Sequence, residues 1–117
     1  MLIVNNAFSL NMLPKPGGTV TALLLELGMY EAAQLIKGAK GNVINNIGHK
    51  NTDRFVRDRL LRFGVILPEG ERKSMKLKED DLLLVAQYCG DRLPEGCTHL
   101  PENSYIKWWS VEYSSKI

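Results

Sequence analysis

The residue in this sequence best placed to do chemistry is His49, within the polar segment 47–52. Gly48 permits a sharp turn at the end of a predicted strand, so His49 stands just before a predicted helix. The free N–H groups and the dipole at a helix N-terminus favour an anion, and a histidine there can give a proton to a bound phosphate. A structural histidine in a tight turn is the alternative explanation of the same pattern.

A second polar segment, residues 6–11, directly follows the predicted strand 2–4. It offers the side-chain amides of Asn6 and Asn11 and the hydroxyl of Ser9, at a place where α/β folds tend to put ligand contacts. These residue types also form turns by bonding to their own backbone. The segment is therefore either part of a ligand site or a self-contained turn.

A third segment, residues 91–96, follows an apolar run and contains Arg92 and Glu95. The planar guanidinium of Arg92 suits a phosphate, and Glu95 can orient Arg92 or accept a hydrogen bond from a ribose hydroxyl. A surface ion pair of little energetic weight is the alternative. Together the three segments supply amides, a hydroxyl, a proton donor, an arginine and a carboxylate, a set that suits phosphodiester cleavage without a metal ion.

No motif in the sequence predicts a metal or a cofactor. The cysteines Cys89 and Cys97 lack metal-ligand spacing, and we expect both to be reduced thiols. His99 is more simply a surface histidine than an acid–base partner of His49. Four arginines share the helix 51–63, but the acid-first pairs Asp53–Arg57 and Asp58–Arg62 favour a solvated, self-paired face. The arginines of this helix are Arg54, Arg57, Arg59 and Arg62.

The elements that position these segments follow from hydrophobic periodicity and from breaks at glycine and proline. We expect strands over 2–4, 19–27, 42–47, 82–88 and 105–113, and helices over 29–37 and 51–63, the second capped by Asn51 or Thr52. Residues 68–81 read as a polar surface connection with a possible strand edge at 74–77, and residues 90–103 as a loop that covers a ligand. The sequence predicts one compact α/β domain over 1–117, with a mixed, roughly five-stranded sheet flanked by helices.

The composition narrows the functional classes. The 117 residues are 44% apolar and 24% charged, with a net charge of +2, which is ordinary for one globular domain. So small a charge argues against a broad duplex-DNA binder. No apolar stretch is long enough to span a membrane, and the N-terminus lacks the basic region of a secretory signal. We therefore expect a cytoplasmic protein.

The three segments also resemble a known family. NNAFSLNML (residues 5–13), NIGHKNT (residues 46–52) and DRLPEG (residues 91–96) are similar to motifs of the viral ring nucleases. These are anti-CRISPR proteins that act against type III CRISPR defence, with relatives in cells and mobile elements. The resemblance implies a homodimeric α/β fold that cleaves cyclic tetra-adenylate held at the subunit interface. It places the catalytic histidine on His49, the loop arginine and glutamate on Arg92 and Glu95, and ligand contacts on Asn6, Ser9 and Asn11, beside Gly48.

The expected reaction begins with attack of a ribose 2′-hydroxyl on the neighbouring 3′-phosphate. His49 protonates the departing 5′-oxygen, and the products are linear di-adenylates with 2′,3′-cyclic phosphate ends. Two other functional classes stay open. One is a non-catalytic binder that sequesters the cyclic nucleotide, and the other is a dimeric nucleic-acid-binding regulator that uses the arginine-rich helix.

Overall fold

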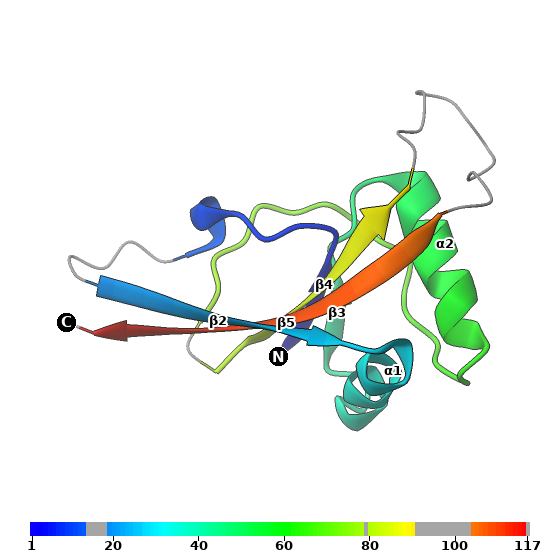
Figure 1. Ribbon diagram of the computed structural model, residues 1–117, viewed down its shortest axis with the longest axis horizontal. Coiled ribbons are helices and arrows are strands. Elements are labelled where there is room, and N and C mark those ends of the chain that lie inside the picture. Colours follow the sequence, from blue (N-terminus) through cyan, green and yellow to red (C-terminus); the bar gives the residue numbers. More distant parts are fainter. Residues whose placement is uncertain (14–18, 79, 91–103, 117) are drawn as a thin grey trace.

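The computed structural model describes residues 1–13, 19–78, 80–90 and 104–116 (Figure 1). This part of the chain forms one mixed sheet, two α-helices and a short 3₁₀ helix, which confirms the predicted α/β fold. The strands are β1 (Leu2–Asn5), β2 (Thr19–Leu27), β3 (Val43–Asn45), β4 (Leu82–Cys89) and β5 (Tyr105–Lys116). The helices are η1 (Leu10–Met12), α1 (Met29–Gly38) and α2 (Lys50–Leu61).

The strand order is β2-β5-β4-β1-β3. Strand β1 lies between β3 and β4 and runs parallel to both, whereas β5 runs antiparallel to β4 and β2. Because parallel strands end on the same side of a sheet, the chain leaves β1, β3 and β4 at one end of the sheet. Ligands of open α/β sheets bind at this carboxyl end, so the topology points to the segments that follow these three strands.

The sheet is apolar on both faces, and a different group of elements covers each one. In β4, Leu84 and Ala86 face the helices, while Leu83 and Val85 face the opposite side. The helix side holds Trp108, which is 1% exposed and whose indole N–H donates to the Met29 sulfur at 3.1 Å. The opposite side is covered by residues around η1 and by the irregular segment before β4, through Met12, Met75 and Leu77.

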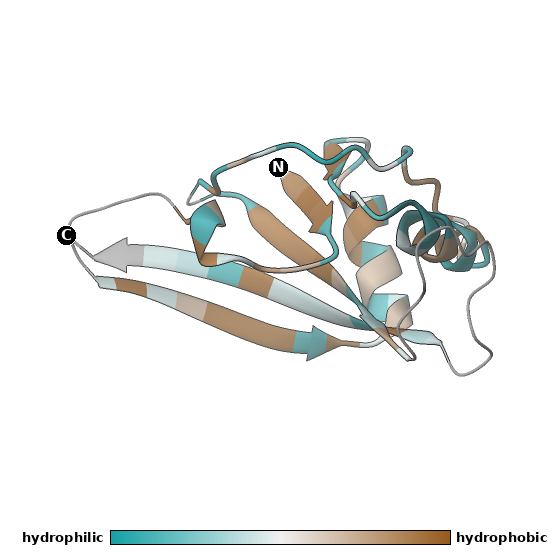
Figure 2. Cartoon of the chain, turned by 90° about the horizontal axis from the view of Figure 1, so that it is seen from above, coloured by the Kyte–Doolittle hydropathy of each residue, from teal (hydrophilic) through white to brown (hydrophobic). Residues whose placement is uncertain are grey.

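Strand β2 forms the outer edge of the sheet and is apolar along most of its length (Figure 2). It exposes three consecutive leucines, Leu23, Leu24 and Leu25, each at least 49% exposed. Edge strands are usually protected by charge, by brevity or by a covering element. The pocket described below lies beside β1 and β3, at the opposite side of the sheet from this apolar edge.

Several predicted boundaries are wrong, and each error has a physical cause. His49, and not Asn51 or Thr52, caps α2, which ends at Leu61 instead of residue 63. Strand β3 covers only Val43–Asn45, because the Asn46 side chain turns to bind Lys73. Strand β5 continues to Lys116, because its residues 108–116 pair with all of β2.

The connection before β4 also differs from the prediction. No strand forms at 74–77, and the connection is more than a surface loop, because Leu77 is buried and Met75 packs against the core. Its backbone is held instead by individual bonds, such as the Leu77 N–H donating to the Met12 carbonyl at 2.7 Å. The connection is therefore part of the packed structure.

Candidate functional site

A pocket of about 610 Å³ lies where the chain leaves β1 and β3. Five of the predicted site residues line it together: Asn6, Ser9, Asn11, Gly48 and His49. The other described lining residues are Asn5, Ala7, Met12, Asn46, Arg72, Lys73, Ser74 and Met75. The remaining two predicted site residues, Arg92 and Glu95, and the alternative histidine His99, lie outside the described residues.

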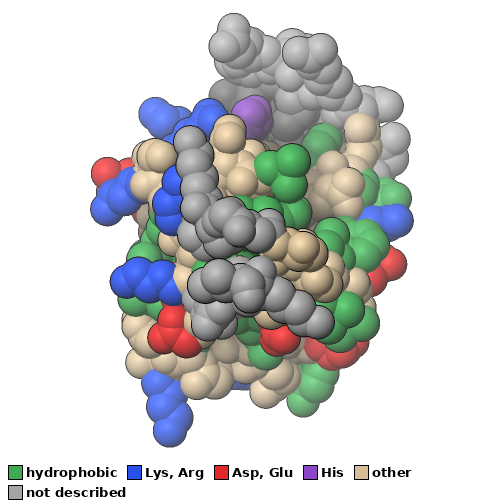
Figure 3. Space-filling model, turned by 90° about the vertical axis from the view of Figure 1, so that its left-hand side faces the viewer, with side chains coloured by type: hydrophobic (Ala, Val, Ile, Leu, Met, Phe, Trp, Pro, Cys, Tyr) green, Lys and Arg blue, Asp and Glu red, His purple; other side chains and the backbone are tan. Residues whose placement is uncertain are grey.

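The pocket has the chemical character of an anion site. Its described lining includes Arg72, Lys73 and His49 but no aspartate or glutamate. Figure 3 shows the histidine next to several lysine and arginine side chains on this side of the molecule. The exposed side-chain amides of Asn6 and Asn11 add donors and acceptors that suit bases and sugars. The arrangement favours a ligand that combines phosphate groups with polar heterocycles.

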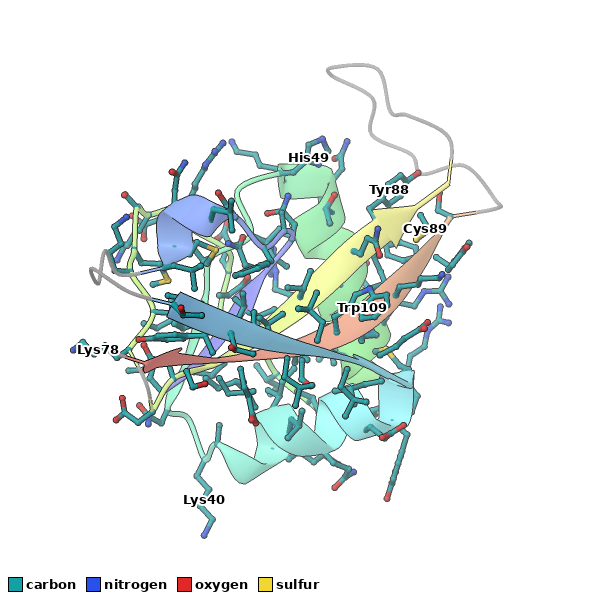
Figure 4. The ribbon with its side chains drawn as sticks, turned by 60° about the vertical axis from the view of Figure 1, so that its left-hand side comes forward. Lys40, His49, Lys78, Tyr88, Cys89 and Trp109 are labelled. Atoms are coloured by element: carbon teal, nitrogen blue, oxygen red, sulfur yellow. The ribbon has the colours of Figure 1, made fainter. Side chains whose placement is uncertain are left out.

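His49 is the N-cap residue of α2, and its side chain is exposed (Figure 4). Its Nδ1 atom accepts a hydrogen bond from the Thr52 backbone N–H at 3.3 Å and lies 3.2 Å from the Thr52 hydroxyl oxygen. A ring nitrogen that accepts from a backbone N–H carries no hydrogen, so in the neutral ring the hydrogen sits on Nε2. The cap thus selects the tautomer in which Nε2 is the donor.

The segment that follows β1 is both a turn and a wall of the pocket. The Ser9 hydroxyl accepts from the Asn11 backbone N–H at 3.2 Å and caps η1, as the turn explanation predicts. The Asn6 backbone N–H donates to the Asn5 side chain at 2.8 Å. The side chains of Asn6 and Asn11 are exposed beside the pocket. The turn therefore leaves these two amides accessible at the pocket.

The segment 72–75 is the part of the site that the sequence prediction missed. Asn46 holds it with two bonds: its Nδ2 donates to the Lys73 carbonyl at 3.1 Å, and its Oδ1 accepts from the Lys73 N–H at 2.6 Å. Asn46 is only 4% exposed, so both of its bonds are shielded from water. This clamp keeps Arg72 and Lys73 at the edge of the pocket. An asparagine pair at the end of an apolar strand was the available signal, because buried amides need partners.

A second buried network fixes the corner between β3 and α2. The Asn45 side chain donates to Asp53 Oδ1 at 2.6 Å and to the Pro68 carbonyl at 2.7 Å. The other Asp53 oxygen accepts from the Gly70 N–H at 3.0 Å and from Arg57 at 3.1 Å. Asp53 is only 3% exposed, and the Arg57 guanidinium neutralises its buried charge. The network joins β3, the first turn of α2 and the loop that carries Arg72.

Gly48 has a steric role that differs from the predicted sharp turn. A Cβ atom at this position would lie 2.8 Å from the Arg72 Cβ and 2.9 Å from its Cδ. The backbone at Gly48 is outside the left-handed region, which the described glycines Gly41, Gly64 and Gly90 occupy. The absence of a side chain therefore lets the Arg72 stem cross directly over the turn before His49.

Comparison with known proteins gives matches both in structure and in sequence. The chain is similar to the solved structure of B116 of Sulfolobus turreted icosahedral virus, with 26% identity and a TM-score of 0.71, over 95% of this chain and 97% of that one. It is also 32% identical over 108 residues to the translation initiation factor IF-2 of Campylobacter curvus. That match covers 86% of this chain but only 12% of the factor.

No protein-family model matches the chain. Among the described residues, no helix has the length and apolar character needed to cross a membrane. The similarity to B116 extends over nearly the whole of both chains, so the same fold is found in a viral protein.

Proposed function

We propose that this protein is a ring nuclease that cleaves cyclic tetra-adenylate to linear di-adenylates with 2′,3′-cyclic phosphate ends, and so switches off type III CRISPR signalling. The observation that carries the proposal is the pocket that gathers Asn6, Ser9, Asn11, Gly48 and His49 from two segments far apart in sequence. These are residues to which the sequence resemblance assigns the site. The similarity to a viral protein over the whole chain supports a viral setting.

In the proposed reaction, a ribose 2′-oxygen of the ring forms a bond to the adjacent phosphorus and gives its proton to solvent water. The bond from phosphorus to the 5′-oxygen breaks in line, and the imidazolium form of His49 supplies from Nε2 the proton that the departing oxygen needs. The neutral ring that remains takes up a proton from solvent again. The Thr52 contacts support this role because they hold Nδ1 against the start of α2 and leave Nε2 as the ring nitrogen that can reach the substrate. A positioned acid of this kind contributes about 10²–10⁴-fold to the rate. The nucleophile belongs to the substrate, so the route takes only RNA-like rings.

The cations at the pocket supply the charge that a phosphorane-like transition state needs. Arg72 and Lys73 lie on the clamped segment, and fixed donors of this kind stabilise developing charge without reorganising. The resemblance adds Arg92 as a phosphate contact and Glu95 as the group that orients it or a ribose hydroxyl. Strand β4, which precedes both residues in sequence, ends on the same side of the sheet as β1 and β3.

The size of the pocket supports a dimer with the ring at the subunit interface. A volume of about 610 Å³ falls in the range of about 300–1,000 Å³ that suits a drug-sized ligand. A ring of four nucleotides is considerably larger than such a ligand, so one chain can enclose only part of it. Two copies related by a two-fold axis match a four-unit ring, and each would cut one of two opposite bonds.

The decisive experiment incubates the purified protein with labelled cyclic tetra-adenylate in excess chelator. We expect conversion to linear di-adenylates that end in a 2′,3′-cyclic phosphate, because the nucleophile and the acid need no metal ion. An intact ring after long incubation at high protein concentration contradicts the nuclease proposal. Tight binding without cleavage identifies a sequestering protein, and tight binding of duplex DNA in place of the ring identifies a nucleic-acid regulator.

Gly48 tests whether Arg72 contributes to ligand binding. In Gly48→Ala, the new methyl group displaces the Arg72 stem. Loss of one charge-assisted contact costs about 1.5–3 kcal/mol, so we expect the affinity for cyclic tetra-adenylate to fall about 10-fold or more. Calorimetric titration measures the change. Gly38→Ala is the matched control, because a Cβ there meets nothing within 4 Å. Equal affinities for the two variants would remove Arg72 from the site.

A further inference from the structure

A second pocket of about 400 Å³ lies on the other side of Gly48 and Arg72 from the first. It is formed between the N-terminal half of α2 and the loop 69–72, and we call it the rear pocket. Its charged lining residues are Lys50, Asp53, Arg54, Arg57, Glu69 and Arg72. Four of these six side chains are cationic, although the whole chain carries a net charge of only +2.

Two of these six charged groups, Asp53 and Arg57, already neutralise each other within the buried network. Asp53 is 3% exposed, and its carboxylate accepts hydrogen bonds from Arg57, Asn45 and the Gly70 N–H. Arg57 is correspondingly committed to Asp53 through both its Nε and its Nη2 atoms, each at 3.1 Å. The side chains left to meet a ligand are therefore three cations and one exposed carboxylate, Glu69.

The three available cations surround the rear pocket from different elements. Lys50 and Arg54 are one helical turn apart on α2, so their side chains share one face. Arg72 approaches from the opposite loop, with its stem over Gly48. Arg54 is exposed, and no acidic partner lies within ion-pair distance of it among the described residues. Three available cations that converge on a pocket and outnumber its one available carboxylate, Glu69, fit an anion.

We propose that the rear pocket is a second anion subsite that binds a phosphate group, with Arg54 and Lys50 on one side and Arg72 on the other. Its volume admits a pyrophosphate or one nucleotide phosphate, but not a ring of four nucleotides. Arg72 lines both pockets, so it can contact a phosphate in either one. The inference goes beyond the proposed reaction, which uses only the first pocket.

Pyrophosphate alone is the probe, titrated into the isotope-labelled protein at constant ionic strength so that screening stays fixed. We expect saturable shifts of the Gly48 and Gly70 amide signals, and about a tenfold weaker dissociation constant in Arg54→Gln. Arg59→Gln is the matched control, since it removes the same charge from α2 at a residue that stacks on Phe55 at 4.7 Å, outside the rear pocket. Non-saturable shifts, or equal weakening in both variants, would overturn the proposal.

A competition titration identifies where the phosphate comes from. If cyclic tetra-adenylate displaces pyrophosphate, the subsite takes a phosphate of the ring itself. If both bind together, the subsite serves a separate phosphate-bearing molecule, and either result supports the subsite. Because the pyrophosphate titration involves no cleavage, a protein that fails to cut the ring can still bind pyrophosphate here. The two proposals therefore fail independently.

Discussion

The His49→Asn variant is expected to cleave cyclic tetra-adenylate about 10²–10⁴-fold more slowly than the wild type while it still binds the ring and keeps its stability. Asparagine is a favoured N-cap residue, and its side-chain oxygen can replace Nδ1 as acceptor for the Thr52 N–H. It has no group that can protonate a departing oxygen as an imidazole does. The variant therefore removes the acid and leaves the cap in place.

His49→Ala completes the comparison because it removes both roles. Loss of the cap costs about 0.5–2 kcal/mol, so this variant should unfold at a lower temperature and be as slow as His49→Asn. Single-turnover rates at saturating protein, together with thermal unfolding, separate the two effects. Wild-type cleavage by His49→Asn would show that His49 is only a cap, which is the structural alternative that the local sequence left open.

The fold could be predicted to the level of element type because each strand and helix has its own hydrophobic pattern. The apolar run 82–88 and the aromatic and β-branched residues of 105–113 identify their strands without reference to the rest of the chain. The ends of the elements depend on distant partners. Ser114 belongs to β5 because it pairs with Thr21 of β2, and nothing in the polar C-terminal sequence indicates that pairing.

The site could be predicted where its residues directly follow strands. Segments 6–11 and 47–52 meet because β1 and β3 are adjacent and parallel, which the order of the elements makes probable but does not fix. Arg72 and Lys73 could not be found in this way. Their position depends on an irregular loop held by Asn46, and a loop without periodicity gives no local indication of where it lies.

In the arginine-rich helix, the spacing of acidic and basic residues predicts ion pairs but does not indicate which of them are buried. The pair Asp53–Arg57 forms as predicted, at 3.1 Å, whereas Asp58 and Arg62 form no ion pair among the described residues. Sequence spacing presents both pairs as equivalent surface contacts. Only the fold reveals that Asp53 is buried and also binds β3 and the loop 68–70, so one of the two pairs belongs to the interior.

Replacing Asp53 with alanine is expected to lower the free energy of unfolding by about 3–5 kcal/mol, the cost of breaking a buried charged network. The change leaves one hydrogen of the Asn45 amide and the Gly70 N–H without an acceptor, and it leaves the half-buried Arg57 without its counter-charge. Single domains of this size have a free energy of unfolding of about 5–15 kcal/mol, so the substitution would remove a large part of it. Urea unfolding followed by tryptophan fluorescence measures the loss, because Trp108 is buried in the core.

Asp58→Ala is the matched control on the same helix, since Asp58 is exposed and outside the network. It should change the free energy of unfolding by no more than about 0.5 kcal/mol. Asp53→Asn should fall between the two, because an amide keeps one acceptor oxygen but not the charge that holds Arg57. Hydrogen exchange at the Gly70 amide should speed up in the same order, since this N–H loses its partner with the carboxylate. If Asp53→Ala were as stable as Asp58→Ala, the loop that carries Arg72 would have to be held by the Asn46 clamp alone.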